Sequence, residues 1–404
     1  MAEPAGGADP GESGGGSAAE GRALFLACAG FALLLHAGLL LSAEGLRAGE
    51  DVVPHLRLIV ATRLTPGLHN VYAPFYHFLG AALEPLVGLA AYPRLFSFAS
   101  AVALVFAFRA FQLAAGLPAT SAALFAFSPY VLTVSWCIPK VEFMGHAVGL
   151  LGLAALLRRR YLALGLAVFA AFLVHTAATL VFGFAAGILA LARRDLRALV
   201  ALALGSSASL PLFAAHLAAG CTLPQAFQFS GTGYLWKGEG LDAVQALWIF
   251  CLASPLALAA GIAGAPALWR RSRPVALMAL GLLFFYLNDL WLLPFGAYTA
   301  GGLYRGLSVL TIPVAIAAGV AAATWPPAWG RALLLACGLW AAAAALWIVP
   351  DSCYVRAIDV AEARSTRVQR CEFAWSNARR PGRAAPGFPA DRPRQGRRLP
   401  RPAP

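Results

Sequence analysis

The stretch "ALFLACAGFALLLHAGLLLSAEGLRAGEDVVPHLRLIVATR", residues 23–63, joins a long apolar run to a polar segment. Its first half, residues 23–43, contains no Asp, Glu, Lys or Arg. A helix of that length can cross a hydrocarbon core of ~30 Å. A cleavable signal peptide has a shorter apolar region after a basic start. We therefore expect an uncleaved first membrane helix that follows Arg22.

The rest of the chain has the same apolar character. Hydrophobic residues make up 60% and charged residues 12% of its 404 residues, and the mean hydropathy is +0.71. A soluble domain needs more charge than this to cover its surface. Further apolar runs follow, and they lack the alternation of a membrane β-barrel. The composition therefore predicts an all-α, polytopic transmembrane bundle of about 10–12 spans, each of ~20 residues.

Three regions of different composition divide the chain. Residues 1–21 are rich in Gly, Ala and Ser, so we expect a disordered tail. Residues 22–350 hold the apolar runs and form the membrane domain. Residues 351–404 are rich in Arg and Pro, and we expect them to be largely disordered. The net charge is +13, and the basic tail suits solvent or anionic lipid headgroups, so we expect no nucleic-acid partner.

Three short basic segments indicate which side of the membrane the loops face. They are Arg158–Arg160, the group Arg193, Arg194 and Arg197, and the group Arg270, Arg271 and Arg273. The positive-inside rule assigns them to the cytoplasm. Residues 161–192 must then cross outward and return, which they can do only as two short helices with a turn near His175 and Thr176. If the first helix runs outward, segment 44–72 lies outside, and the Arg-rich tail then also falls outside by the number of spans. This opposes the positive-inside rule for the tail, so either one span is miscounted or the tail is an exported appendage.

The acidic pair Glu50–Asp51 follows the first span directly. The next residues place apolar side chains at helical spacing, which predicts a short amphipathic helix in the membrane interface: Val52, Leu56, Ile59, Val60 and Leu64. Asp51 lies at its first turn, where negative charge is favourable. Asp51 is either a helix cap or a carboxylate for a lipid-borne substrate, acting as general base or as ligand of a divalent cation. His55, one turn later, shares its face.

The segment "LHNVYAPFYHFLGAALEPLVG", residues 68–88, begins a second span with aromatic residues and His77. Aromatic side chains at the start of a span are typical of the membrane interface. His77 is a candidate ligand of the substrate. Glu84 falls deeper in the same span, where an unpaired charge is costly. We expect it to pair with an arginine such as Arg109.

Two further groups combine a helix start with ionisable side chains. In "SPYVLTVSWCIPKVEFMGHAVGL", residues 128–150, a helix restarts after a proline break with Lys140, Glu142 and His146. Ionisable groups at membrane depth are functional candidates, and the alternative is an internal salt bridge between Lys140 and Glu142. Tyr304 and Arg305 begin a late span. The Arg305 guanidinium either binds a phosphate or extends to the membrane interface.

The order of these parts resembles the GT-C superfamily of polytopic glycosyltransferases, which includes protein mannosyltransferases and aminoarabinose transferases. The resemblance covers about residues 22–350 and begins with the acidic pair and the helix "DVVPHLRLIVATR". The other matching segments are "APFYHFLGAAL", "YPRLFSFASAVALVFAFRAFQLAAGLP", "SPYVLTVSWCIPKVEF" and "GGLYRGLSVLTIPVAI". Two features depart from the family: the short basic tail replaces the large soluble C-terminal domain of many relatives, and the acidic pair reads Glu-Asp.

The resemblance implies an inverting transfer of a sugar from a polyprenyl-phosphate carrier to a glycan, lipid or protein acceptor. The transfer would take place on the outer face of a membrane, which we expect to be the bacterial inner membrane. Asp51, with Glu50 as the alternate, would be the catalytic base or hold a divalent cation. Arg305 would neutralise the departing phosphate. The remaining candidate substrate ligands are His55, His77, Lys140, Glu142, His146 and Tyr304.

Two other functions also fit the sequence. A secondary transporter or flippase for a lipid-linked or anionic solute would have broken helices, but usually in repeated halves, and no repeat is visible. A non-catalytic subunit of an envelope assembly would bind lipid without turnover. The sequence contains no P-loop, Rossmann glycine motif, HExxH or GxSxG. Their absence argues against nucleotide-driven transport and several hydrolase classes.

Overall fold

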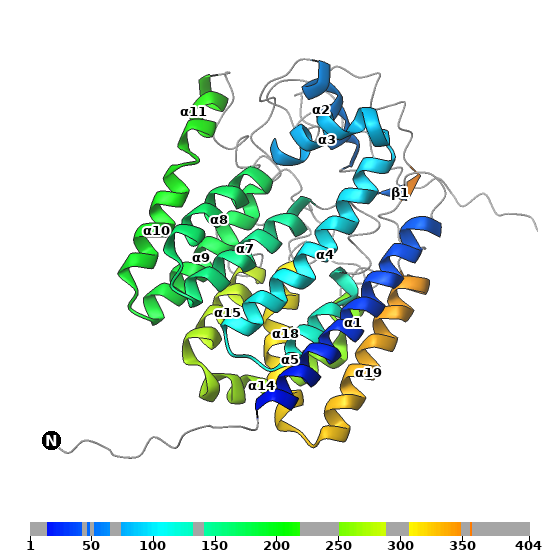
Figure 1. The fold of residues 1–404 in the computed structure, drawn as a ribbon, viewed down its shortest axis with the longest axis vertical. Coiled ribbons are helices and arrows are strands. Elements are labelled where there is room, and N and C mark those ends of the chain that lie inside the picture. The colour runs from blue at the N-terminus through cyan, green and yellow to red at the C-terminus, as the bar shows by residue number, and fades with distance from the viewer. Residues whose placement is uncertain are drawn as a thin grey trace, which may run out of the picture.

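The computed structural model describes residues 14–42, 47–48, 52–64, 74–131, 141–218, 250–287, 307–348 and 356–357. Within these ranges the chain is helical apart from one pair of two-residue strands (Figure 1). The predicted all-α class is therefore confirmed. The helices are α1 (Gly14–Ser42), α2 (Val52–Leu64), α3 (Pro74–Val87), α4 (Ala91–Ala114), α5 (Ala119–Ala126), α7 (Val141–Leu157), α8 (Tyr161–Val174), α9 (Thr176–Ala192), α10 (Leu196–Ser207), α11 (Leu210–Ala218), α14 (Pro255–Arg271), α15 (Arg273–Tyr286), α18 (Leu307–Thr324), α19 (Pro327–Ala343) and the π-helix η4 (Ala344–Ile348).

Several of these helices have the length and composition of membrane spans. Among the described residues, five are long and apolar enough to cross a membrane: Ala19–Leu39, Ala91–Ala114, Leu196–Ala215, Leu307–Thr324 and Pro327–Leu346. Large apolar side chains face outward on the peripheral helices, for example Leu34, Leu162, Leu196 and Leu335. Such an apolar exterior is unfavourable in water and suits lipid.

Helix α18 is the centre of the bundle. Its residues from Leu307 to Ala322 are all buried, and it contacts α5, α14 and α15. The contact with α5 is close because Gly319 has no side chain there: a Cβ would overlap the backbone of Ser121. The Thr120 hydroxyl donates a 2.7 Å hydrogen bond to the Gly319 carbonyl. Small residues with hydroxyl partners are a common way for helices to associate in membranes.

The two short helices expected between residues 161 and 192 are present. Helix α8 ends at Val174, α9 begins at Thr176, and His175 between them has an extended backbone with φ −162° and ψ 107°. The prediction of a turn near His175 and Thr176 is confirmed. The tip of this hairpin is buried inside the protein, so two helices too short to cross the membrane separately can form one re-entrant pair.

Two helix boundaries differ from the expectation. Helix α1 begins at Gly14, before Arg22, and so includes residues 14–21 of the tail that composition predicts to be disordered. The apolar run of residues 118–137 is long enough to predict one span, but α5 within it ends at Ala126. Pro129 explains this end, since the residue before a proline is disfavoured in the helical conformation.

A short strand pair links two distant parts of the chain. β1 (Arg47–Ala48) pairs antiparallel with β2 (Arg356–Ala357). The start of the Arg-rich tail therefore lies beside the segment that follows α1. This agrees with the span count, which assigned both segments to the same side of the membrane. It also shows order at two residues of a tail that composition predicts to be largely disordered.

Candidate functional site

Helices α2 and α3 form a layer at one end of the bundle, which we call the outer cap (Figure 1). A separate apolar cluster joins it to the first turns of α4 and α7 and to the last residue of α8. Its members are Val52, Val53, Leu56, Ile59, Tyr76, Leu89, Tyr92, Phe96, Val141 and Val174. The Tyr92 hydroxyl donates a 2.7 Å hydrogen bond to the Tyr76 carbonyl and so ties α4 to α3.

Helix α2 confirms the helix predicted after the acidic pair, but its buried residues are not confined to one face. Besides the expected apolar residues, His55, Leu58 and Thr62 are buried, whereas Leu64 is 71% exposed. A helix that lies flat on a membrane surface buries one stripe and leaves the opposite face polar. Helix α2 is covered on several faces, so it forms part of the protein interior.

The outer cap contains a buried pair of histidines. Nδ1 of His55 lies 2.9 Å from Nε2 of His77, within hydrogen-bond distance, and the ring of Tyr76 meets His55 edge-on at 5.3 Å. One imidazole donates and the other accepts, so the accepting ring is neutral. Burial, and secondly the nearby His175, lowers the pKa of His55 to about 3. The structure thus brings together two of the predicted substrate ligands.

This lowered pKa predicts a pH-dependent stability. Between pH 6.5 and about 3 the unfolded His55 takes up a proton, whereas the folded His55 stays neutral. Protons then favour the unfolded state, so stability is complete above pH 6.5 and decreases as the pH falls through this window, by at most ~1.4 kcal/mol per pH unit. Thermal unfolding of the wild type and of His55→Gln in detergent, between about pH 4 and 8, tests this. The variant should lose less stability in acid, and an equal or steeper loss would contradict the assignment.

His175 belongs to the same region, and sequence reasoning identified it only as a turn. Its Nδ1 accepts a 3.0 Å hydrogen bond from the Ala178 backbone N–H and so caps α9. In the neutral form its proton is therefore on Nε2. Helix α7 approaches the hairpin at Gly145, where a Cβ would lie 2.9 Å from the Cβ of His175. The feature of the sequence that could have identified His175 as a site residue is its position, as a lone histidine between two apolar runs too short to cross the membrane.

Glu142 and His146 lie in the first turns of α7, on either side of Gly145 in sequence. His146 is buried, with its ring 5.2 Å from Phe182, and Glu142 is half-buried. Val141, beside Glu142, packs into the cluster under the outer cap. The region beneath α2 and α3 therefore combines buried imidazoles with a carboxyl group from another helix.

Glu84 pairs with an arginine, as predicted, but this arginine is not Arg109. Glu84 forms an ion pair with Arg63, from the last turn of α2. Arg109 instead donates to the side chain of Gln112, and its guanidinium lies 5.2 Å from the ring of Phe25. The α2–α3 packing brings Arg63 to Glu84, a proximity that the spacing of the two residues in the sequence did not indicate.

The other predicted site residues, Glu50, Asp51, Lys140, Tyr304 and Arg305, lie outside the described residues. In sequence, Asp51 directly precedes α2 and Lys140 directly precedes α7. Within the described ranges, no group of three or more His, Cys, Asp or Glu side chains could hold a metal ion. The divalent cation predicted at Asp51 remains a prediction.

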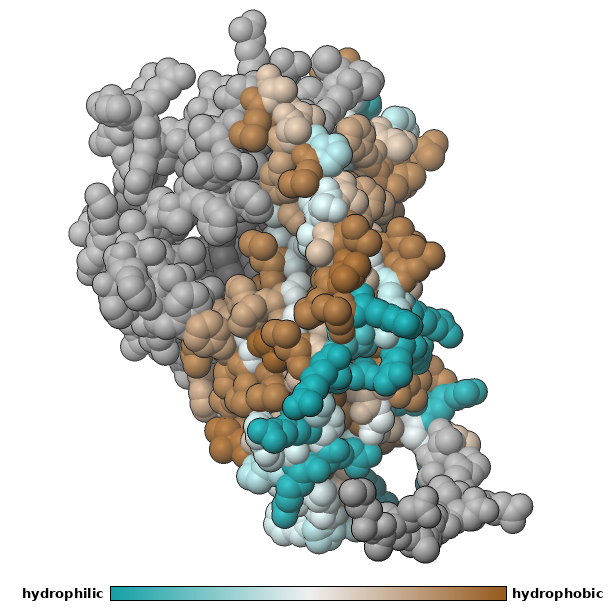
Figure 2. All heavy atoms as spheres, turned by 90° about the vertical axis from the view of Figure 1, so that its left-hand side faces the viewer, coloured by the Kyte–Doolittle hydropathy of each residue, from teal (hydrophilic) through white to brown (hydrophobic). Residues whose placement is uncertain are grey.

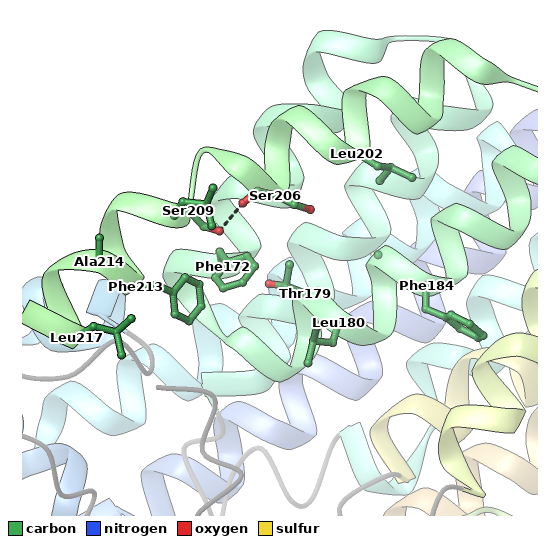
Figure 3. Close-up of a pocket in the computed structure, with 12 residues that line it drawn as sticks. Phe172, Thr179, Leu180, Phe184, Leu202, Ser206, Ser209, Phe213, Ala214 and Leu217 are labelled. Carbon is green, nitrogen blue, oxygen red and sulfur yellow. Dashed lines mark hydrogen bonds between the residues drawn. The ribbon is translucent and has the colours of Figure 1, made fainter. Parts of the chain in front are cut away.

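An apolar groove of about 680 Å³ runs between the α8–α9 hairpin and helices α10 and α11 (Figure 3). The rings of Phe172 and Phe213 meet edge-on at 5.2 Å across it. Thr179, one turn after His175, adds a hydroxyl to its lining. The other residues that line it include Leu180, Gly183, Phe184, Leu202, Ser206, Leu210 and Leu217. The groove therefore passes close to the hairpin tip, and its lining is mostly apolar.

These features define a polytopic helical membrane protein. A solved structure with this fold is the crystal structure of ArnT from Cupriavidus metallidurans in the apo state, an aminoarabinose transferase. The two chains are 19% identical, with a TM-score of 0.54; the match covers 80% of this chain and 65% of the ArnT chain. No family model matches the sequence, and no curated protein matches it either. At this identity the likeness shows the fold.

Proposed function

We propose that this protein is a membrane glycosyltransferase. It transfers a sugar from a polyprenyl-phosphate carrier to a glycan, lipid or protein acceptor at the outer face of the bacterial inner membrane. The observation that supports this proposal most directly is the fold shared with ArnT, itself a glycosyltransferase. The groove beside the hairpin adds a place for an apolar carrier next to buried polar groups.

In this reaction, the acceptor hydroxyl attacks the anomeric carbon of the sugar. The bond between that carbon and the phosphate oxygen breaks, and polyprenyl phosphate leaves. Asp51 takes the hydroxyl proton, with Glu50 as the alternate. Asp51 directly precedes Val52, the buried first residue of α2, in the sequence. Arg305 offsets the charge that develops on the phosphate. The buried imidazoles of the outer cap position the sugar.

A donor panel tests the proposal directly. Purified protein in lipid is incubated with several polyprenyl-phosphate sugars, and transfer to acceptors is measured by mass spectrometry. Transfer by the wild type from at least one donor is expected. Movement of the donor across the membrane of sealed vesicles without release of sugar would instead support a transporter or flippase. Binding of the carrier without turnover or movement would support a non-catalytic subunit.

The groove yields a sharper prediction. Gly183 lines it, and a Cβ at this position meets nothing within 4 Å. Gly183→Leu should therefore fill the groove without a clash in the fold. We expect a KM for long polyprenyl donors that rises ~10-fold, because a buried chain loses about two methylene contacts worth ~0.8 kcal/mol each. A donor with a short isoprenoid chain should be nearly unaffected.

Gly187→Leu is the matched control. Gly187 lies one turn further along α9 and also has open space around a Cβ, but it does not line the groove. Its KM should match that of the wild type for both donors. If Gly183→Leu and Gly187→Leu behave alike, the carrier chain does not occupy this groove, although the glycosyltransferase proposal would stand.

A further inference from the structure

The turns after α7 and α9 share an uncommon backbone feature. Arg159 has a φ of 55° and Arg194 a φ of 54°, both in the left-handed region. Each is the left-handed residue of a Schellman turn, which is usually glycine. In the first turn the N–H of Arg159 donates to Leu156 O at 3.0 Å, and the N–H of Arg160 to Ala155 O at 2.8 Å. The turn after α9 repeats this pattern.

A third turn of this kind in the same chain has glycine at the left-handed position. The turn after α4 has the same pair of hydrogen bonds, and its left-handed residue is Gly116, with a φ of 61°. A side chain raises the energy of this conformation. Within the described part of the chain, no hydrogen bond or ion pair involves the guanidinium of Arg159 or Arg194. The two arginines therefore carry a backbone cost without a partner inside the described fold.

The two turns are held rigidly side by side, and we call them the paired basic turns (residues 158–160 and 193–197). The Arg193 guanidinium donates to the carbonyls of Leu156 and Leu157 at 3.4 and 3.2 Å. The Tyr161 hydroxyl donates a 3.1 Å hydrogen bond to Asp195. Asp195 also caps α10. Asp195, the one carboxylate of the paired basic turns, thus accepts hydrogen bonds from Tyr161 and from the start of α10. The arginines outnumber it, so the paired basic turns carry a net positive charge.

The paired basic turns lie at the edge of the lipid-facing surface. Leu162, Leu191 and Leu196 adjoin them in sequence and are 79%, 64% and 71% exposed. On this side of the molecule, hydrophilic residues gather in the lower half, next to a broad apolar area (Figure 2). Guanidinium groups beside outward-facing leucines match the boundary between phospholipid headgroups and acyl chains.

We propose that the paired basic turns bind the phosphodiester headgroup of an anionic phospholipid, with Arg159 and Arg194 as its ligands. A planar guanidinium can donate two parallel hydrogen bonds to a phosphate. The acyl chains of the lipid lie against the exposed leucines. Arg193 and Arg271 have a different role, because each caps a neighbouring helix end: Arg271 donates to the Gly116 carbonyl at 2.7 Å.

The double variant Arg159→Gly/Arg194→Gly tests this, because glycine suits both backbone positions. Thermal unfolding is measured in neutral detergent while phosphatidylglycerol or phosphatidylcholine is titrated in. Phosphatidylglycerol should raise the wild-type Tm, and phosphatidylcholine should not. In lipid-free detergent the double variant should have an equal or slightly higher Tm. Its apparent affinity for phosphatidylglycerol should fall by ~10-fold or more, because it loses the charge-assisted hydrogen bonds of two guanidinium groups to the phosphate.

Two controls distinguish a specific lipid-headgroup site from nonspecific attraction between the basic protein and anionic groups. Arg22→Gln/Arg331→Gln removes the same net charge from exposed positions on α1 and α19, and its lipid affinity should stay within about threefold of the wild type. Inorganic phosphate at millimolar concentration should not reproduce the Tm shift, because it lacks acyl chains. Unchanged lipid affinity in the glycine variant, equal loss in the control variant, or equal stabilisation by phosphate would each overturn the proposal.

Discussion

Asp51→Asn is expected to lower the rate of sugar transfer by ~100-fold or more, the range typical for loss of a general base. Asparagine has nearly the same shape as aspartate but cannot accept the proton of the acceptor hydroxyl. It is also a good N-cap residue, so the substitution removes the charge and keeps a side chain that favours the same position at a helix start. The measurement is the transfer rate at saturating donor and acceptor. The Tm of the variant should stay within a few degrees of the wild type.

This substitution separates the two interpretations of the acidic pair. If Asp51 only caps the helix, Asp51→Asn retains activity and the assigned role fails. If Glu50→Gln is the variant that loses activity, Glu50 is the acting carboxylate. A chelator distinguishes a cation ligand from a base: activity that disappears with EDTA and returns with Mg²⁺ or Mn²⁺ indicates a metal at Asp51. Activity that persists in EDTA indicates proton transfer.

Gly319→Ala is expected to destabilise the protein by about 1–3 kcal/mol, the usual range for overpacking a core. A Cβ at this position would overlap the backbone of Ser121, and backbone cannot rotate away as a flexible side chain would. The helices α5 and α18 must then separate, which also weakens the hydrogen bond from Thr120 to the Gly319 carbonyl. Thermal unfolding in detergent should show a Tm lower by several degrees.

Gly187→Ala provides the control for this prediction. The chemical change is identical and also lies within a helix, but a Cβ at Gly187 meets nothing within 4 Å. Alanine favours helix over glycine by up to ~1 kcal/mol, so Gly187→Ala should leave the Tm unchanged or raise it. Two variants with the same Tm would show that the α5–α18 contact is not tight.

The parts of the fold that were predictable depend on length and charge. Apolar runs without charge predicted membrane helices, and their short length between residues 161 and 192 predicted the α8–α9 turn. The spacing of apolar residues after Asp51 predicted α2. It did not predict that α2 is covered on several faces, because spacing shows which residues can share a face and not how many neighbours a helix has.

The candidate site was only partly predictable for the same reason. His55 and His77 were both selected from the sequence, as residues near the membrane interface. Their hydrogen bond depends on how α2 and α3 cross, and neither sequence spacing nor hydropathy describes this. The choice of Arg109 for Glu84 was wrong because it relied on charge alone, and Arg63 is the residue that packing brings near.

By itself the sequence determined the membrane class, the turn between α8 and α9 and the distribution of basic loops, because the thickness of the lipid core and the cost of burying charge act on each segment separately. The tertiary structure decided which helices touch, which arginine meets Glu84, where His175 lies and where a groove is left. Those features depend on close packing of small residues such as Gly319 against distant segments. Close packing involves many side chains at once, so it is a property of the folded chain and not of any one segment.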